Sequence, residues 1–125
     1  MTTYGQAKLE RKKGNYELSN NILLSYTFLN TDNKFKPSKT KRNLIGKNYL
    51  DLKKYEMALE YFKSVESSLL DIGDSELEKD LYNNIAICYK HLGDFNRAIQ
   101  YYDLHAEKSK LYLETKVDQT IKLQN

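Results

Sequence analysis

The sequence predicts an all-α protein, and three observations support this prediction. Its 125 residues contain one Pro and five Gly, too few for the tight turns that a sheet protein of this size needs. Hydrophobic residues make up 40% of the chain and charged residues 30%, a balance typical of helices with one buried face. Small and aromatic residues also recur with a period of about forty residues, which indicates repeated helical hairpins.

Six helices in three hairpins account for the whole pattern. Apolar periodicity, glycines and capping residues place these helices at residues 3–13, 15–30, 39–53, 55–71, 75–92 and 94–116. The connection 31–38 carries the only Pro, and we expect it to be the most mobile loop. Ser75 followed by Glu78 is a capping-box pattern, which predicts a strong helix start at Ser75.

Internal repeats give the register of the hairpins. A shift of forty residues pairs Ile45 with Ile85, Gly46 with Ala86, Tyr49 with Tyr89, Tyr55 with Phe95, Ala58 with Ala98, and Phe62 with Tyr102. A fainter first copy lies thirty-nine residues before the second and contains Ala7, Gly14, Tyr16, Ser19 and Leu23. Small residues let paired helices approach closely, so these positions mark the helix crossings. The segments Gly14-Asn15-Tyr16 and Gly93-Asp94-Phe95 predict the same turn, in which Gly ends one helix and a polar residue caps the next.

This order of residues resembles the tetratricopeptide repeat. The third hairpin matches best, with an aromatic, apolar, small and aromatic series followed by a small and an aromatic residue: Tyr82, Ile85, Ala86, Tyr89, Ala98 and Tyr102. The second hairpin departs from the pattern at Arg42 and the first at Glu10, where an aromatic residue is expected. The long period is similar to that of kinesin light chains, spindle-orientation adaptors and peptide-sensing regulators of Gram-positive bacteria.

The resemblance implies a single domain built as a right-handed α-solenoid of about three hairpins. Its repeats are expected at about residues 1–33, 39–72 and 79–112, followed by a helical extension at 111–125. It also implies a protein-binding adaptor or scaffold that is not an enzyme and uses no cofactor.

The first helix of each hairpin lines a concave groove in this family. Transfer of the groove positions predicts a peptide-binding set of Asn43, Lys47, Asp51, Asn83, Asn84, Ile87, Lys90 and His91. Flanking members are Leu44, Leu50 and Asp80, and the first repeat adds Lys8, Arg11 and Lys12. Asn side chains both donate and accept hydrogen bonds, which suits the backbone of an extended peptide, and Lys favours acidic groups.

Charge is distributed unevenly along the chain. Residues 1–56 contain twelve Lys and Arg against five Asp and Glu, a net +7, whereas residues 57–125 contain eight against twelve, a net −4. The basic part favours acidic partners, although two differently solvated faces would give the same asymmetry. A competing interpretation is nucleic-acid binding by a basic cluster beside Phe35, formed by Lys34, Lys36, Lys39, Lys41 and Arg42. The sequence pI of about 8.8 is low for that class.

Residues suited to catalysis are sparse. No glycine-rich phosphate loop occurs, and His91 and His105 have no further ligand at metal-binding spacing, so neither a nucleotide nor a metal site is predicted. The acidic group Glu76, Glu78 and Asp80 fits a helix start, where the helix dipole stabilises negative charge. The single Cys88 lies in an apolar stretch and is predicted to be buried and structural.

Two expectations concern the cellular setting and the tail. A lone cysteine and the lack of any signal-like or membrane-spanning segment suggest a reducing, cytoplasmic location without membrane contact. In the tail Leu113, Val117 and Ile121 recur every four residues, which indicates an amphipathic helix. This helix either caps the last hairpin or mediates homo-oligomer formation, and the sequence leaves both open.

Overall fold

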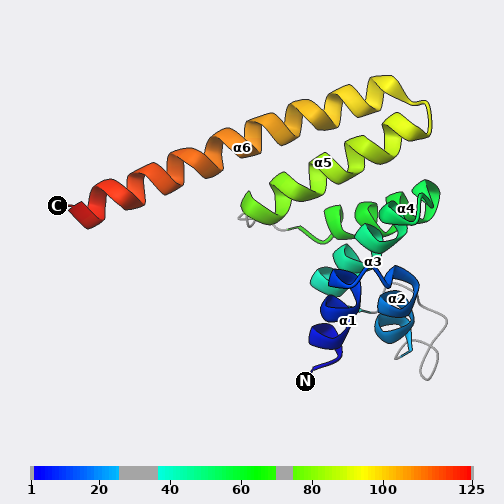
Figure 1. The fold of residues 1–125 in the computed structure, drawn as a ribbon. Coiled ribbons are helices and arrows are strands. Elements are labelled where there is room, and N and C mark those ends of the chain that lie inside the picture. Colours follow the sequence, from blue (N-terminus) through cyan, green and yellow to red (C-terminus); the bar gives the residue numbers. More distant parts are fainter. Residues whose placement is uncertain (1, 26–36, 70–74, 125) are drawn as a thin grey trace. The chain divides into compact units, whose positions relative to one another are not determined.

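The structure is a computed structural model, and it describes residues 2–25, 37–69 and 75–124. All regular structure in these ranges is helical and forms three antiparallel hairpins (Figure 1). The helices are α1 (Thr3–Lys12), α2 (Tyr16–Leu24), α3 (Lys39–Asp51), α4 (Tyr55–Glu66), α5 (Ser75–His91) and α6 (Phe95–Gln124). The predicted all-α hairpin fold is confirmed. Residues 26–30 of the predicted second helix and 31–36 of the predicted mobile loop lie outside the described residues.

The ends of α2, α4 and α6 differ most from the predictions. α2 ends at Leu24, before the predicted residue 30. α4 ends at Glu66, before the predicted residue 71, because serine hydroxyls compete for its last carbonyl groups. The hydroxyls of Ser67 and Ser68 both donate to the carbonyl oxygen of Ser64, at 2.9 Å. α6 continues to Gln124 without a break, so the C-terminal extension is the end of this helix.

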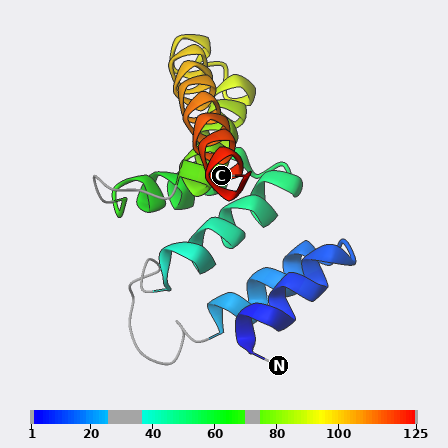
Figure 2. The same ribbon diagram turned by 90° about the vertical axis from the view of Figure 1, so that its left-hand side faces the viewer.

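The chain comprises two compact units, each with its own packing. Residues 1–68 hold α1 to α4, and residues 69–125 hold α5 and α6. In the first unit α3 packs against both α4 and α2, and Figure 2 shows α3 beside the hairpin of α1 and α2. In the second unit α5 and α6 pack along each other and α6 extends well past the start of α5 (Figure 1).

The three hairpin turns share one backbone conformation. Gly14, Lys53 and Gly93 occupy equivalent positions with φ of 85°, 62° and 84°. In each turn the next N–H donates to a carbonyl of the preceding helix, for example Asp94 N to Tyr89 O at 2.9 Å. The predicted glycine turns are therefore confirmed, and the second hairpin uses a lysine in the same left-handed conformation.

The predicted polar caps differ between the first and third turns. The Asp94 carboxylate accepts a hydrogen bond from the backbone N–H of Arg97, at 3.2 Å, as a helix cap should. The prediction for Asn15 is wrong, since its side chain makes no capping bond. Instead its amide nitrogen donates to the Glu10 carboxylate at 2.8 Å, and this bond lowers the pKa of Glu10.

Close contact at the helix crossings fixes each hairpin. Ala7, Ala58 and Ala86 are completely buried. At Gly46 the approach is tighter still, since an added Cβ would lie 2.7 Å from Cε1 of the buried Phe62 ring. Any larger residue there must displace a side chain that fills the centre of the α3–α4 hairpin.

We therefore expect Gly46→Ala to destabilise the first unit by about 1–3 kcal/mol through overpacking, although Ala is the better helix former. The free energy of unfolding in urea, followed by circular dichroism, measures the effect. In the double variant with Phe62→Leu the cost of Gly46→Ala should shrink because the ring is gone. An unchanged melting curve for Gly46→Ala would show that the contact with Phe62 is not restrictive.

The turn conformation gives a second expectation. Lys53→Gly should stabilise the chain by about 0.5–1 kcal/mol, because glycine adopts positive φ without the steric cost that lysine bears. Gly93→Ala should destabilise by about 1 kcal/mol for the converse reason. Thermal unfolding of both variants checks the pair, and a lower melting temperature for Lys53→Gly would contradict the expectation.

Candidate functional site

The predicted groove residues of the second hairpin lie on one face of α3. Asn43, Lys47, Leu50 and Asp51 are spaced by four, three and one residues, which places them on the same side of the helix. Asn43, Lys47 and Leu50 are half-buried and Asp51 is exposed. We call these four residues the α3 face.

α1 supplies a neighbouring cation to the α3 face. The Arg11 guanidinium lies 2.6 Å from the Asp51 carboxylate, so the structure brings together two predicted groove residues from consecutive first helices. Arg11 also lies over the Tyr16 ring, with its central carbon 5.4 Å from the ring centroid. Arg11 and Asp51 therefore neutralise each other, which leaves other cations to attract an acidic ligand.

Behind this ion pair lies a buried polar network centred on Asn48. The Asn48 side chain is completely buried, and its nitrogen donates to Ser19 Oγ and to Asn20 Oδ1, both at 2.8 Å. Its oxygen accepts a hydrogen bond from Arg11 Nη1 at 3.0 Å. Ser19 in turn donates to the Ala7 carbonyl oxygen at 2.7 Å. Side chains of α1, α2 and α3 are thus joined by hydrogen bonds that satisfy Asn48, whereas the Asn20 side-chain nitrogen is buried without a partner among the described residues.

Sequence reasoning missed this network, although a signal existed. Asn48 aligns with Cys88 under the forty-residue shift, and Cys88 had been predicted to be buried. An amide at a buried repeat position requires partners, and Ser19 and Asn20 are polar residues on the helix that precedes it.

One predicted groove residue is not on the open face. Leu44 is only 6% exposed and packs in a core with Ala7, Leu23, Ile45 and Tyr61. It faces the preceding hairpin because it lies about a quarter turn away from Asn43 and Lys47. Asn84 aligns with Leu44 in the repeat register, so its role in binding is the least supported among the predicted residues.

Lys47 and Asn43 are the members of the α3 face with unused polar groups. Lys47 makes no ion pair with any described residue. The Asn43 side-chain oxygen is buried and accepts no hydrogen bond within the described part of the chain. Leaving a buried acceptor unpaired costs about 1–3 kcal/mol, so a ligand that supplies a donor would relieve that cost.

The other predicted groove residues lie on α5 in the second unit. They are Asn83, Asn84, Ile87, Lys90 and His91. Their spacing puts four of them on one side of the helix, and Asn84 lies about a quarter turn from Asn83, at the edge of that side. Lys90 and His91 are exposed, whereas the other three are half-buried. We call this set the α5 face. Ile87 gives it an apolar centre that the α3 face lacks.

Arg42, assigned to the basic cluster in the nucleic-acid interpretation, points inward. It is 8% exposed and donates to the carbonyl oxygens of Pro37 at 3.0 Å and Ser64 at 2.8 Å, and to Ser68 Oγ at 3.0 Å. Burial lowers its pKa. It joins the start of α3 to the end of α4 in place of the expected aromatic residue. Lys34 and Lys36 lie outside the described residues, so the structure provides no inward or outward placement for them.

Two predicted features of the second unit have structural roles. Cys88 is completely buried, and burial raises its pKa to about 12, so the thiol stays protonated and unreactive at neutral pH. Glu78, from the acidic group at the start of α5, pairs with Lys108 of α6 at 2.9 Å. This contact raises the pKa of Lys108. His105 Nδ1 lies 2.8 Å from the Lys79 carbonyl oxygen and also links the two helices.

Comparisons with known proteins agree with this architecture. A tetratricopeptide-repeat family model matches residues 42–67 and 79–104, within the second and third hairpins. Eleven chains of solved structures are similar. One is the TPR domain of Arabidopsis FLU, with a TM-score of 0.67 and 19% identity over 87% of this chain and 92% of that chain. No curated protein matches the sequence.

The hairpins have small residues at their helix crossings, and the second helix of the first hairpin, α2, packs on the first helix of the second hairpin, α3. These two features define a helical-repeat scaffold. Residues 42–67 and 79–104 match the tetratricopeptide repeat, and the chain has the fold of a tetratricopeptide-repeat domain. Such repeats generally mediate protein–protein interactions and are typically not enzymes, so the chain is a protein-binding scaffold. None of the described helices is long and apolar enough to cross a membrane.

The inward position of Arg42 can be tested. Arg42→Met keeps an unbranched side chain but removes the donor to the Pro37 carbonyl oxygen, the donor to Ser68 Oγ and one of the three donors to the Ser64 carbonyl oxygen. We expect a loss of about 2–3 kcal/mol in unfolding free energy, as for hydrogen bonds to charged groups. The matched control is Lys41→Met, which removes the same charge from the neighbouring residue and should have little effect. Equal stability of Arg42→Met and wild type in urea would contradict this role.

Proposed function

We propose that the α3 face binds an acidic segment of a partner protein. The observation that carries the proposal is Lys47, a cation on the first-helix face with no ion pair among the described residues. A ligand carboxylate would give this ammonium group its counter-charge. The family's general role in protein binding supports a protein rather than a small molecule as the ligand.

The charge of the surrounding unit supports an acidic ligand. Residues 1–68 contain thirteen Lys and Arg against seven Asp and Glu, a net +6. Such an excess steers acidic partners toward the unit and speeds their association. Residues 69–125 contain seven against ten, a net −3, so the acidic preference is assigned to the first unit alone.

Asn43 supplies the second element of recognition. Its amide lies one turn from Lys47, so an extended peptide that pairs with Lys47 passes close to it. Rotation of the amide would let its oxygen accept a backbone N–H of the ligand while its nitrogen donates to a carbonyl group. The ionic contact and the amide contact differ in their response to salt, because salt screens mainly the ionic one.

The α5 face is proposed as a separate contact surface of the same scaffold. It offers the amides of Asn83 and Asn84 and the apolar side chain of Ile87. The exposed Lys90 and His91 add polar contacts at its end. We also propose a cytoplasmic location, which is supported by a buried Cys88 that has no second cysteine in the sequence to pair with.

The test uses arrayed extended peptides that differ only in the number of Asp and Glu residues. We expect the intact chain to retain acidic peptides, and the affinity to fall but not vanish as salt rises. Lys47→Glu should weaken binding about threefold to tenfold, since the ionic contact becomes a repulsion. Asn43→Ala should remove the part of the peptide affinity that persists at high salt.

The matched control is Lys54→Glu, an exposed lysine in the turn after α3, which makes the same change in net charge. If Lys54→Glu and Lys47→Glu weaken binding equally, the effect is one of total charge and the ligand does not lie on the α3 face. Retention of neutral and acidic peptides alike would contradict the acidic preference. Circular dichroism confirms that each variant is folded.

A further inference from the structure

α6 carries an exposed face whose equivalent on α2 is covered by the next helix. The first repeat lies thirty-nine residues before the second, and the second lies forty residues before the third. Adding the two shifts aligns Phe95 and Ile99 of α6 with Tyr16 and Asn20 of α2. In the first unit this face of α2 packs against the next helix, α3. Asn20 is 4% exposed there, whereas Ile99 is 58% exposed.

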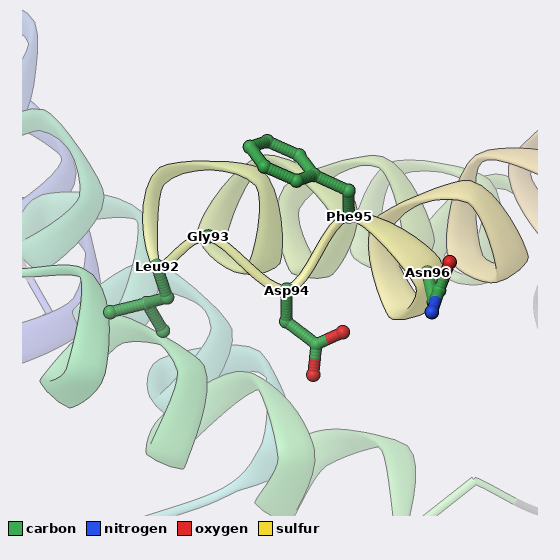
Figure 3. A pocket seen from close by; sticks show the side chains of 5 residues that line it. All are labelled: Leu92, Gly93, Asp94, Phe95 and Asn96. Atoms are coloured by element: carbon green, nitrogen blue, oxygen red, sulfur yellow. The ribbon is translucent and has the colours of Figure 1, made fainter.

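The exposed face begins at the turn between α5 and α6. Leu92 and Phe95 are 39% and 63% exposed and line a surface hollow together with Gly93, Asp94 and Asn96 (Figure 3). Figure 3 shows the Phe95 ring on the opposite side of the turn from the Asp94 carboxylate. The corresponding hollow at the first turn includes Leu52, which comes from the following hairpin. Among the described residues, the hollow at the last turn is lined by Leu92 to Asn96 alone.

The apolar face continues along the rest of α6. Tyr112 of α6 contacts α5, since its ring centroid lies 4.8 Å from Lys79 Nζ. Beyond it, Leu113, Val117 and Ile121 are 62%, 56% and 51% exposed. At 100° per residue they fall on the same side of the helix as Phe95 and Ile99. These five side chains form what we call the α6 stripe.

One border of the α6 stripe is acidic. The helical period places four carboxylates along it: Asp103, Glu107, Glu114 and Asp118. All four are exposed and form no ion pair with a described residue. Lys110 is the one cation on the same border. An apolar stripe beside a row of carboxylates complements a helix that carries apolar residues next to Lys or Arg.

From this complementarity we infer that the α6 stripe binds an amphipathic helix with a basic border, supplied by a partner protein. The first unit shows the apolar part of such a contact, since Leu44 and Ile45 of α3 pack in one core with Leu23 of α2. The basic border of the inferred occupant is argued from the carboxylates of α6 alone, and the proposal does not depend on a ligand at the α3 face.

Pairing with a second copy of α6 fits the charges less well. In an antiparallel pair the acidic borders of both copies face each other. In a parallel pair the opposite border offers a single cation, Lys116, against the row of carboxylates. Like charges that face each other across a helix pair are unfavourable. A basic partner helix meets neither difficulty.

The test uses two synthetic helical peptides with the same leucine stripe and either lysine or glutamate along its border. Binding to the intact chain is measured by calorimetry at low salt. We expect the lysine peptide to bind at least about tenfold more tightly, since several exposed ion pairs each contribute a factor of about two to five. Equal binding of the two peptides, or binding of neither, would overturn the proposal.

Variants of α6 locate the contact. The double substitution Glu107→Lys with Glu114→Lys should reverse the preference between the peptides, and Leu113→Ser with Val117→Ser should weaken both at least about tenfold. The control Glu17→Lys changes an exposed carboxylate on α2 and should leave the preference as it is. An unchanged preference in the α6 charge variant would refute the site. A second result would also refute the proposal. If light scattering detects a dimer of the wild-type chain and Leu113→Ser makes it monomeric, a second copy occupies the α6 stripe.

Discussion

The contact between Gly46 and the Phe62 ring is the constraint on which the second hairpin depends. At 2.7 Å from the position of a Cβ, the ring leaves no room for a side chain, so α3 and α4 can approach only because residue 46 has none. The same arrangement recurs with the buried Ala7 and Ala86 in the other hairpins. Close approach in turn fixes which side of each first helix is left open, because the side that crosses the second helix is fully occupied.

A second constraint joins one hairpin to the next, and it is polar. Asn48 is buried between α1, α2 and α3 with all of its hydrogen-bonding groups engaged, so a shift of α3 along α2 would leave several of them unpaired. A leucine contact tolerates small slips, whereas a set of directed hydrogen bonds defines one register. The ion pair of Arg11 with Asp51 extends this network to the surface, and the α3 face therefore begins at a point that the core has already positioned.

The repeat pattern predicted the helices, the turns and the small residues at the crossings, because each of these follows from local sequence and a fixed period. What it could not supply was the partner of each polar side chain. Arg42 occupies an aromatic position, and only the nearby end of α4 reveals that its guanidinium binds carbonyl groups inside the hairpin. Leu44 was assigned to the groove by transfer of the family's groove positions, yet it lies a quarter turn from Asn43 and packs in the core. The other predicted groove residues of α3 and α5 lie on the α3 face and the α5 face, and their role in binding stays a prediction.

The two units present opposite chemistry on the same scaffold. In residues 1–68 basic residues are in excess and Lys47 stands on an open first helix, whereas the exposed border of α6 holds carboxylates next to apolar side chains. In stacked hairpins, one face of each second helix is buried against the first helix of the next hairpin. A second helix whose equivalent face is apolar and exposed therefore lacks the helix that would normally cover it. α6 meets that description at Ile99 and again at Val117. An acidic ligand bound at the α3 face would therefore leave the α6 stripe exposed. The two surfaces can bind different partners without competing.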